Sequence, residues 1–141
     1  MSEPRIYLLD TNIISHMMRE PAGRATQKFA AVAAMDLTQG VVTSTVVLYE
    51  LQFGLQRRPN LRLSAALDRI LTGVEVLSLD IDVVPRYAQL RAVLEENGTP
   101  IGPNDTLIAA HALTLGATLV SADAEFARVP GLQVENWLQH L

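Results

Sequence analysis

Two acidic residues follow short apolar runs that are typical of buried strands. Asp10 comes directly after residues 6–9, and Asp123 comes shortly after residues 118–120. Short continuous apolar runs favour strands that are covered on both faces of a parallel sheet. Ligands of such sheets bind beyond the carboxyl ends of the strands. If these two strands are neighbours, both carboxylates emerge at the same edge of the sheet.

Two further acids, Glu50 and Asp105, belong to expected helices. The positions three and four residues from Glu50 are apolar or small, namely Val46, Val47, Phe53 and Gly54. Asp105 opens a strongly apolar helix. An ionised carboxylate in such surroundings costs free energy unless its charge is offset. We therefore take Asp10, Glu50, Asp105 and Asp123 as candidate catalytic residues.

A divalent cation would allow four neighbouring carboxylates to stay ionised. The chain has no Cys and no pair of His residues at ligand spacing, and all-oxygen ligation favours Mg²⁺ or Mn²⁺ over Zn²⁺. Such a cation polarises a phosphate oxygen, activates a bound water and stabilises the leaving oxygen, while one acid accepts a proton. The four acids together indicate phosphoryl chemistry.

Most of these acids also have a purely structural explanation. Asp105 would be favourable near the positive end of a helix without any metal, and Asp123 suits a turn or a helix cap. The purely structural explanation is weakest for Glu50, because a carboxylate beside Val and Phe inside a helix seldom lacks a partner.

The apolar pattern predicts strands that alternate with helices. Strands are expected at residues 6–9, 41–43, 74–79, 118–120 and 133–135, and helices at 11–19, 25–35, 45–56, 63–71, 83–96 and 105–115, with a helical turn at 124–127. Asp82 is expected to cap the helix that follows it. This alternation predicts an α/β fold, a three-layer α/β/α sandwich around a mostly parallel sheet of four to five strands. The length suits a single domain over residues 1–141.

The bulk composition excludes some classes of function. A net charge of −4 argues against a protein that holds nucleic acid by bulk positive charge. It does not exclude an enzyme that meets phosphates through a metal and a few local arginines. The absence of Cys agrees with a cytoplasmic protein, and no apolar run approaches the roughly 20 residues of a membrane span.

Four segments, taken in order, resemble a known family. They are Leu-Leu-Asp-Thr-Asn at 8–12, Tyr-Glu-Leu-Gln-Phe-Gly at 49–54, Gly-Thr-Pro-Ile-Gly-Pro-Asn-Asp-Thr-Leu-Ile-Ala-Ala-His at 98–111, and Val-Ser-Ala-Asp-Ala-Glu-Phe at 120–126 with Arg-Val-Pro-Gly-Leu at 128–132. Together they resemble the PIN domain and, more narrowly, the VapC toxins of bacterial type II toxin–antitoxin pairs. The resemblance spans nearly the whole chain.

This resemblance implies a metal-dependent endoribonuclease that is silenced by a small VapB-type antitoxin, and a homodimer or a larger toxin–antitoxin assembly. It implies that Asp10, Glu50, Asp105 and Asp123 are the catalytic acids and that Asn12 and Ser121 are supporting polar residues that line the site. Asp10 and Asp105 would contact Mg²⁺, and we expect Asp123 to be a third ligand, with Mn²⁺ as a substitute ion. The segment at 98–111 is similar to that of VapC toxins acting on initiator tRNA, which suggests a tRNA substrate.

The same segments also show two departures from the family. Relatives often carry an Asn-rich sequence after the fourth strand, and the position that corresponds to Asp123 varies among them. Many relatives carry Thr or Ser three residues before the helix glutamate, where this chain has Val47. The polar contact that such a residue would provide is therefore not expected here.

Two other classes of function compete with the nuclease. Haloacid-dehalogenase-type phosphatases require a second acid two residues after the first, where this chain has Asn12. They and the response-regulator receivers also need a lysine near the acids, but Lys28 is the only lysine. The other alternative is a non-catalytic PIN-like module that binds RNA or protein, and the presence of all four acids argues against it.

Several remaining residues are explained most simply by packing or solvation. We expect His111 to be a hydrogen-bonded packing residue and Trp137 to cover the core or an edge of it. Tyr49 and Phe53 could form a dimer or antitoxin surface, but packing in the core is the simpler interpretation. The arginines at 57, 58, 86 and 91 could hold phosphates, but solvated surfaces and ion pairs are the simpler interpretation.

Overall fold

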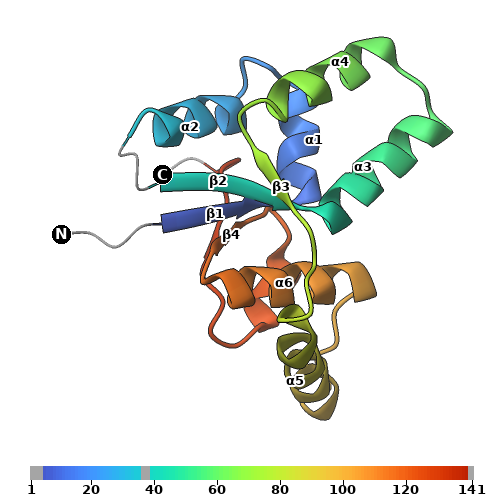
Figure 1. Cartoon of the computed structure of the whole chain (residues 1–141), viewed down its shortest axis with the longest axis vertical. Coiled ribbons are helices and arrows are strands. Elements are labelled where there is room, and N and C mark those ends of the chain that lie inside the picture. The colour runs from blue at the N-terminus through green and yellow to red at the C-terminus, as the bar shows by residue number, and fades with distance from the viewer. Residues whose placement is uncertain (1–4, 36–38, 140–141) are drawn as a thin grey trace.

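The computed structural model describes residues 5–35 and 39–139, and its centre is a five-stranded sheet (Figure 1). The strand order is β3-β2-β1-β4-β5, and all four pairings are parallel. The strands are β1 (Arg5–Leu9), β2 (Gln39–Ser44), β3 (Glu75–Leu77), β4 (Thr118–Val120) and β5 (Val134–Glu135).

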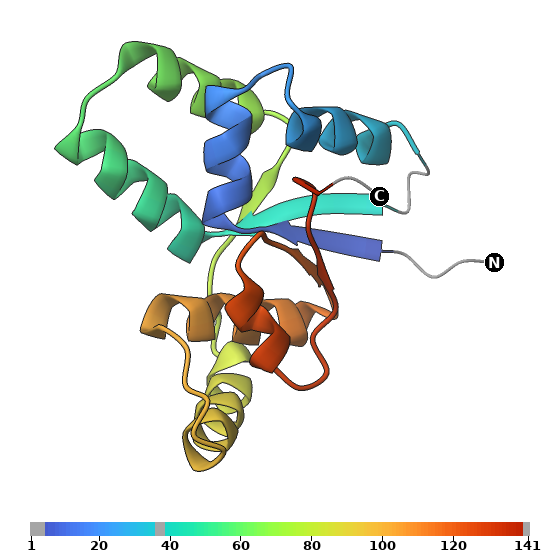
Figure 2. The ribbon, with the colours of Figure 1, turned by 180° about the vertical axis from the view of Figure 1, so that it is seen from behind.

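Helices cover both faces of this sheet (Figures 1 and 2). They are α1 (Thr11–Arg19), α2 (Arg24–Ala33), α3 (Thr45–Arg57), α4 (Leu61–Ile70), α5 (Val83–Glu96) and α6 (Pro103–Leu115), with a 3₁₀ turn η1 (Ala124–Arg128). Helices α1 to α4 lie on one side, and α5, α6 and η1 lie on the other. The predicted three-layer α/β/α sandwich is therefore confirmed, with a sheet that is wholly parallel within the described residues.

The register of the strands brings three chain segments to one edge of the sheet. Leu9 at the end of β1 is level with Thr43 of β2 and Val120 of β4. The backbone N–H of Asp10 then donates to the carbonyl of Val120 at 2.9 Å, so the pairing continues one residue beyond β1. The residues that follow β1, β2 and β4 therefore leave the sheet side by side at its carboxyl edge.

Local sequence explains where the elements next to this edge begin. Tyr7, Leu8 and Leu9 are all buried, as a strand covered on both faces requires. Asp10 has an extended backbone and its side chain accepts from the N–H of Thr11, which starts α1 as an N-cap does. Pro103 occupies the first turn of α6, where its missing N–H costs nothing.

Some boundaries differ from the predicted ones. Helix α6 begins at Pro103 rather than at position 104 or 105, and α2 ends at Ala33 instead of reaching position 35. The third strand, predicted over 74–79, is limited to Glu75–Leu77 because it pairs only with the last residues of β2, which ends at Ser44.

Two predictions about individual side chains are wrong. Asp82 makes no side-chain cap, because its backbone is already helical (φ −68°, ψ −18°) and an N-cap needs an extended one. Tyr49 and Phe53 do not pack inward: they are 71% and 63% exposed. They lie on the outer face of α3, since Val47 and Leu51 turn the opposite face towards the core.

The predicted packing role of Trp137 is confirmed. Its ring is buried and lies 5.6 Å from the ring of Tyr7, centroid to centroid. Its Nε1–H donates to the Glu135 carboxylate at 3.1 Å, which satisfies the polar end of a buried indole. Separately, none of the helices in the described residues is long and apolar enough to cross a bilayer.

Candidate metal and catalytic site

Asp10 is the most enclosed of the four predicted acids, with only 3% of its surface exposed. Its Oδ1 accepts from the Thr11 N–H at 2.8 Å, and its Oδ2 accepts from the Ser121 hydroxyl at 2.7 Å. Burial raises the pKa of the carboxyl, these two hydrogen bonds lower it, and the charges of Glu50 and Asp123 raise it again. The carboxylate is thus held in place by hydrogen bonds although its charge is poorly solvated.

Asn12 and Ser121, the two polar residues that the resemblance singles out, both contact Asp10. The Asn12 amide donates to Asp10 Oδ2 and to Ser121 Oγ, each at 3.3 Å. Asn12 Oδ1 accepts from the Ala122 N–H at 3.1 Å, and Ser121 Oγ accepts from the Asp123 N–H at 3.0 Å. These bonds fasten the start of α1 to the segment after β4, so Asp123 is fixed relative to Asp10.

Glu50 is anchored to the same edge by a residue that the sequence did not single out. The Thr11 hydroxyl donates to Glu50 Oε1 at 2.6 Å. A hydroxyl thus contacts the helix glutamate although Val47 replaces the expected Thr or Ser. The only sequence feature that could have pointed to Thr11 is its position directly after Asp10. The sequence does not reveal that α3 passes over Thr11.

The helices that carry Glu50 and Asp105 are joined by a buried hydrogen bond. Ser44 caps α3 by accepting from the Val46 N–H, and its Oγ lies 3.0 Å from Nδ1 of His111 in α6. Burial lowers the pKa of His111, which favours the neutral ring. The predicted packing role of His111 is confirmed, and the contact fixes the spacing between α3 and α6.

Asp105 lies in the first turn of α6 and faces the other acids. Its pKa is raised to about 6, first by burial and then by the charges of Asp10, Asp123, Glu50 and Glu125. The other three predicted acids therefore lie within electrostatic reach of Asp105. The sequence prediction that they converge on one edge of the sheet agrees with this arrangement.

A tighter group of acids lies within this set. One carboxylate oxygen each of Asp105, Asp123 and Glu125 lies within 4.8 Å of the others. Asp123 also caps η1 by accepting from the Glu125 N–H at 2.9 Å. Glu125 was not predicted as a site residue. The sequence feature that could have identified it is its position two residues after Asp123, on an expected helical turn. Asp10 is outside this tight group.

The donor set fits a divalent cation of the Mg²⁺ type. All of the converging side chains are carboxylates, which are the ligands that hard cations prefer. Burial first and then the charges of the neighbouring acids raise the pKa values of Asp10 and Asp105, and a bound cation would offset both effects. The residues therefore match a metal site in both chemistry and charge.

The pKa of Asp105 gives a test in metal-free protein. Because its folded pKa is raised, the folded state binds this proton more tightly than the unfolded state, so stability falls as pH rises from about 4 to above 6. Asp105→Asn removes the carboxylate charge that burial and the neighbouring acids make unfavourable. In EDTA, we expect the melting temperature of the variant to exceed that of wild type by more at pH 8 than at pH 5. An equal difference at both pH values would contradict the assigned cause.

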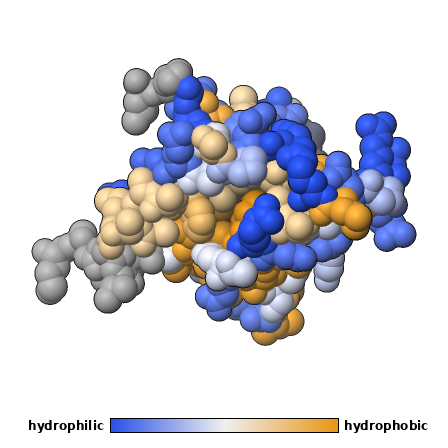
Figure 3. All heavy atoms as spheres, turned by 90° about the horizontal axis from the view of Figure 1, so that it is seen from above, coloured by the Kyte–Doolittle hydropathy of each residue, from blue (hydrophilic) through white to orange (hydrophobic). Residues whose placement is uncertain are grey.

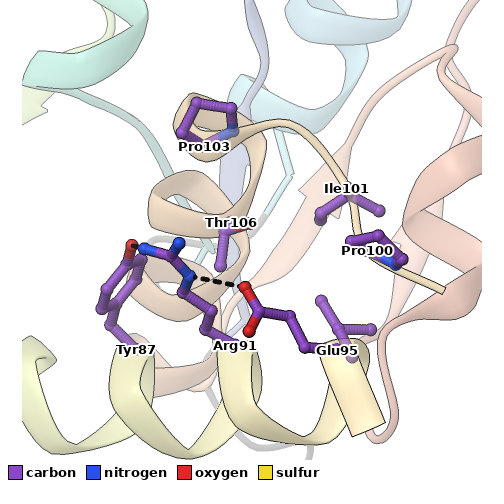
Figure 4. Close-up of a pocket in the computed structure, with 8 residues that line it drawn as sticks. Tyr87, Arg91, Glu95, Pro100, Ile101, Pro103 and Thr106 are labelled. Carbon is purple, nitrogen blue, oxygen red and sulfur yellow. Dashed lines mark hydrogen bonds and ion pairs between the residues drawn. The ribbon is translucent and has the colours of Figure 1, made fainter. Parts of the chain in front are cut away.

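A separate pocket of about 190 Å³ lies between α5 and the start of α6 (Figure 4). Its arginine, Arg91, bonds to the Tyr87 hydroxyl and to Glu95 of its own helix, each at 3.0 Å. This confirms the simpler interpretation of Arg91 as an ion-paired surface residue.

The chain is similar to known proteins over nearly its whole length. A family model described as PIN domain matches residues 7–132. The chain is 34% identical over 134 residues to Ribonuclease VapC2 of Rickettsia felis, covering 94% of this chain and 98% of that protein. It is 33% identical over 135 residues to the tRNA(fMet)-specific endonuclease VapC of Shigella flexneri, covering 93% and 97%.

Solved structures agree with these matches. The chain superposes on VapBC2 from Rickettsia felis, bound to a DNA fragment from their promoter, with a TM-score of 0.86 and 33% identity over 94% of this chain and 98% of that one. For VapBC-1 from nontypeable Haemophilus influenzae the TM-score is 0.82, with 31% identity over 95% and 99%.

Proposed function

Because the chain belongs to the PIN domain family, and to its VapC-type members, we propose that it is a metal-dependent endoribonuclease acting as a toxin. The observation that carries the proposal is the convergence of Asp10, Glu50, Asp105 and Asp123 at the carboxyl edge of the sheet. Hydrolysis of RNA phosphodiester bonds needs concentrated negative charge that can hold a cation beside the scissile phosphate. We assign residues 1–141 to one such domain.

Mg²⁺ is the ion we assign to the site, with Mn²⁺ as a substitute, because both accept all-oxygen ligands. When bound, it would polarise a phosphate oxygen and offset the charge that develops on the leaving oxygen. Asp10, Asp105 and Asp123 are the residues we assign to hold it. Glu125, which shares the tight group with Asp105 and Asp123, is a further oxygen donor within reach.

The surrounding residues orient these acids. Ser121 and the Thr11 N–H fix the two oxygens of Asp10. Thr11 fixes Oε1 of Glu50, so Glu50 is the acid that we assign to accept the proton of the attacking water. The water oxygen bonds to phosphorus, the bond to the leaving oxygen breaks, and that oxygen takes up a proton.

The relatives suggest the biological setting. Solved relatives are VapBC toxin–antitoxin complexes, so the partner we propose is a small VapB-type antitoxin, in a homodimeric or larger assembly. One relative is a tRNA(fMet)-specific endonuclease, and we take tRNA as the first substrate to test. A toxin of this kind acts on cellular RNA and would therefore work in the cytoplasm.

Removing the metal is the direct test of the proposed function. We expect purified protein to cut tRNA in Mg²⁺ or Mn²⁺, to lose this activity in EDTA, and to regain it when the ion is restored. Gel analysis of the RNA fragments measures the result. Cleavage that persists in EDTA would refute the metal site. RNA binding without cleavage in either ion would favour the non-catalytic module instead.

A further inference from the structure

A stripe of side chains on α3, formed by Glu50, Phe53 and Arg57, begins at the acid site. Phe53 and Arg57 take no part in the proposed hydrolysis. Glu50, Phe53 and Arg57 are spaced i, i+3 and i+7, which places them on one face of a helix. Glu50 bonds to Thr11 at the site, whereas Phe53 and Arg57 lie progressively farther along the helix. The distance from position 50 to position 57 is about 10 Å along the axis.

Two aromatic rings on this part of α3 are open to solvent. Tyr49 is 71% exposed and Phe53 is 63% exposed. The guanidinium carbon of Arg57 lies 5.7 Å from the centroid of the Phe53 ring, a cation–π arrangement that orients the arginine over the ring. Exposed rings with arginine beside them are the side chains on which unstacked bases stack.

The charge along this segment is opposite to that of the whole chain. Residues 51–67 contain Arg57, Arg58 and Arg62 and no acid, although the net charge of the protein is −4. Within residues 5–35 and 39–139, none of these three arginines forms a salt bridge, whereas Arg91 and Arg128 do. The end of the molecule where Figure 1 places the turn from α3 to α4 is coloured hydrophilic in Figure 3, on the right.

Gly54 leaves an opening beside this stripe. A Cβ added at Gly54 would meet nothing within 4 Å, so nothing in the described chain requires a glycine here. A glycine inside a helix is less stable than alanine. Its position one turn beyond Glu50 leaves room for the close approach of another backbone.

We propose that the α3 arm, defined as Tyr49, Phe53, Gly54, Arg57, Arg58 and Arg62, binds unpaired nucleotides of the RNA next to the scissile phosphate. Bases stack on the two rings, and the arginines meet the phosphates. The axial distance of about 10 Å between Glu50 and Arg57 corresponds to about three stacked nucleotides. This inference rests on the proposed ribonuclease function, and it assigns to one face of α3 the contacts with the nucleotides beside the scissile phosphate.

Binding is tested first in EDTA, where no cleavage occurs. Fluorescence anisotropy compares a short unstructured oligoribonucleotide with the same sequence in a duplex. We expect Phe53→Ala to weaken single-strand binding about tenfold and duplex binding less, because paired bases cannot stack on the ring. Replacing Arg57 and Arg58 by Gln should reduce the slope of log affinity against log salt by about 1.4.

Gly54→Ala separates a binding role from a structural one. The added methyl group should raise the melting temperature while it weakens RNA binding. The matched control is Arg86→Gln, which removes an exposed arginine from α5 on the other side of the sheet. Its affinity for the oligoribonucleotide should equal that of wild type within twofold.

Activity distinguishes this inference from the proposed function. With Mn²⁺, the α3-arm variants should raise KM for RNA and leave hydrolysis of bis(p-nitrophenyl) phosphate unchanged, because that small diester cannot reach the arm. If wild type cleaves RNA and the α3-arm variants have the same KM and the same RNA affinity as wild type, the inference about the α3 arm is wrong and the proposed function stands. If wild type hydrolyses neither RNA nor the small diester, the proposed function is wrong. The binding assay in EDTA would still show whether the α3 arm binds RNA. Variants that keep RNA affinity but lose antitoxin binding would show a protein interface and overturn the inference.

Discussion

Asp10→Asn is expected to reduce RNA cleavage by at least about 10²- to 10³-fold, the scale on which removal of one essential electrostatic group acts. Asn keeps the shape of the side chain and can still accept the hydrogen bond from the Thr11 N–H. It removes the negative charge that we assign to hold the cation. The initial rate of tRNA cleavage in Mg²⁺ measures the effect.

The same substitution should not destabilise the protein. The fold raises the pKa of Asp10, chiefly by burial, so the ionised form is less favourable in the folded state than in the unfolded one. A neutral isostere removes this cost but loses the acceptor that Oδ2 offers to Ser121 and Asn12, so the melting temperature in EDTA should stay close to that of wild type.

Asp68→Asn is the matched control, because Asp68 is an exposed acid on α4. It should leave both the cleavage rate and the melting temperature near their wild-type values. If Asp10→Asn retained more than a tenth of the wild-type rate, Asp10 would not be an essential ligand. If it lost activity only because it unfolded, the melting temperature would show this.

The acids at strand ends were predictable because chain order and sheet geometry fix their positions together. An apolar run followed by an acid predicts a carboxylate at the carboxyl edge of a parallel sheet. The register of β1 with β4 then brings Asp10 and the segment of Asp123 together. The prediction depended on one assumption, that these two strands are neighbours, and the strand order confirms it.

Contacts between elements distant in sequence were not predictable in the same way. Thr11 and Glu50 are 39 residues apart, and no periodicity shows that α3 crosses the start of α1. Glu125 lies in an exposed turn, where an acid is usually explained by solvation. It is the cap that Asp123 provides to η1 that turns this residue towards the site.

The exposed aromatic residues illustrate a different limit. Helical spacing shows which residues share a face, but it does not show whether another element covers that face. On α3, Val47 and Leu51 contact the core while Phe53 is exposed, because α3 leads away from the end of β2 beyond the sheet (Figure 1). The apolar character of Tyr49 and Phe53 therefore predicted burial wrongly.

Phe126→Ala is expected to cause the largest loss of stability among the changes considered. Phe126 is 1% exposed and is one of the largest fully buried side chains. Truncation of a buried Phe costs about 3–5 kcal/mol, which corresponds to a fall in melting temperature of roughly 10–20 °C for a chain of this size. Thermal unfolding followed by circular dichroism measures the change.

This substitution should also impair the site, for a reason separate from global stability. Phe126 anchors η1, the turn that carries Glu125 and is capped by Asp123. With the anchor removed, these two acids lose their fixed position relative to Asp105, so cleavage at a temperature where the variant is still folded should require a higher Mn²⁺ concentration. Phe126→Leu keeps most of the buried volume, and we expect smaller changes in both measurements. A variant that melts early but keeps the wild-type metal requirement would show that η1 does not position the acids, because the loss would then belong to the core alone.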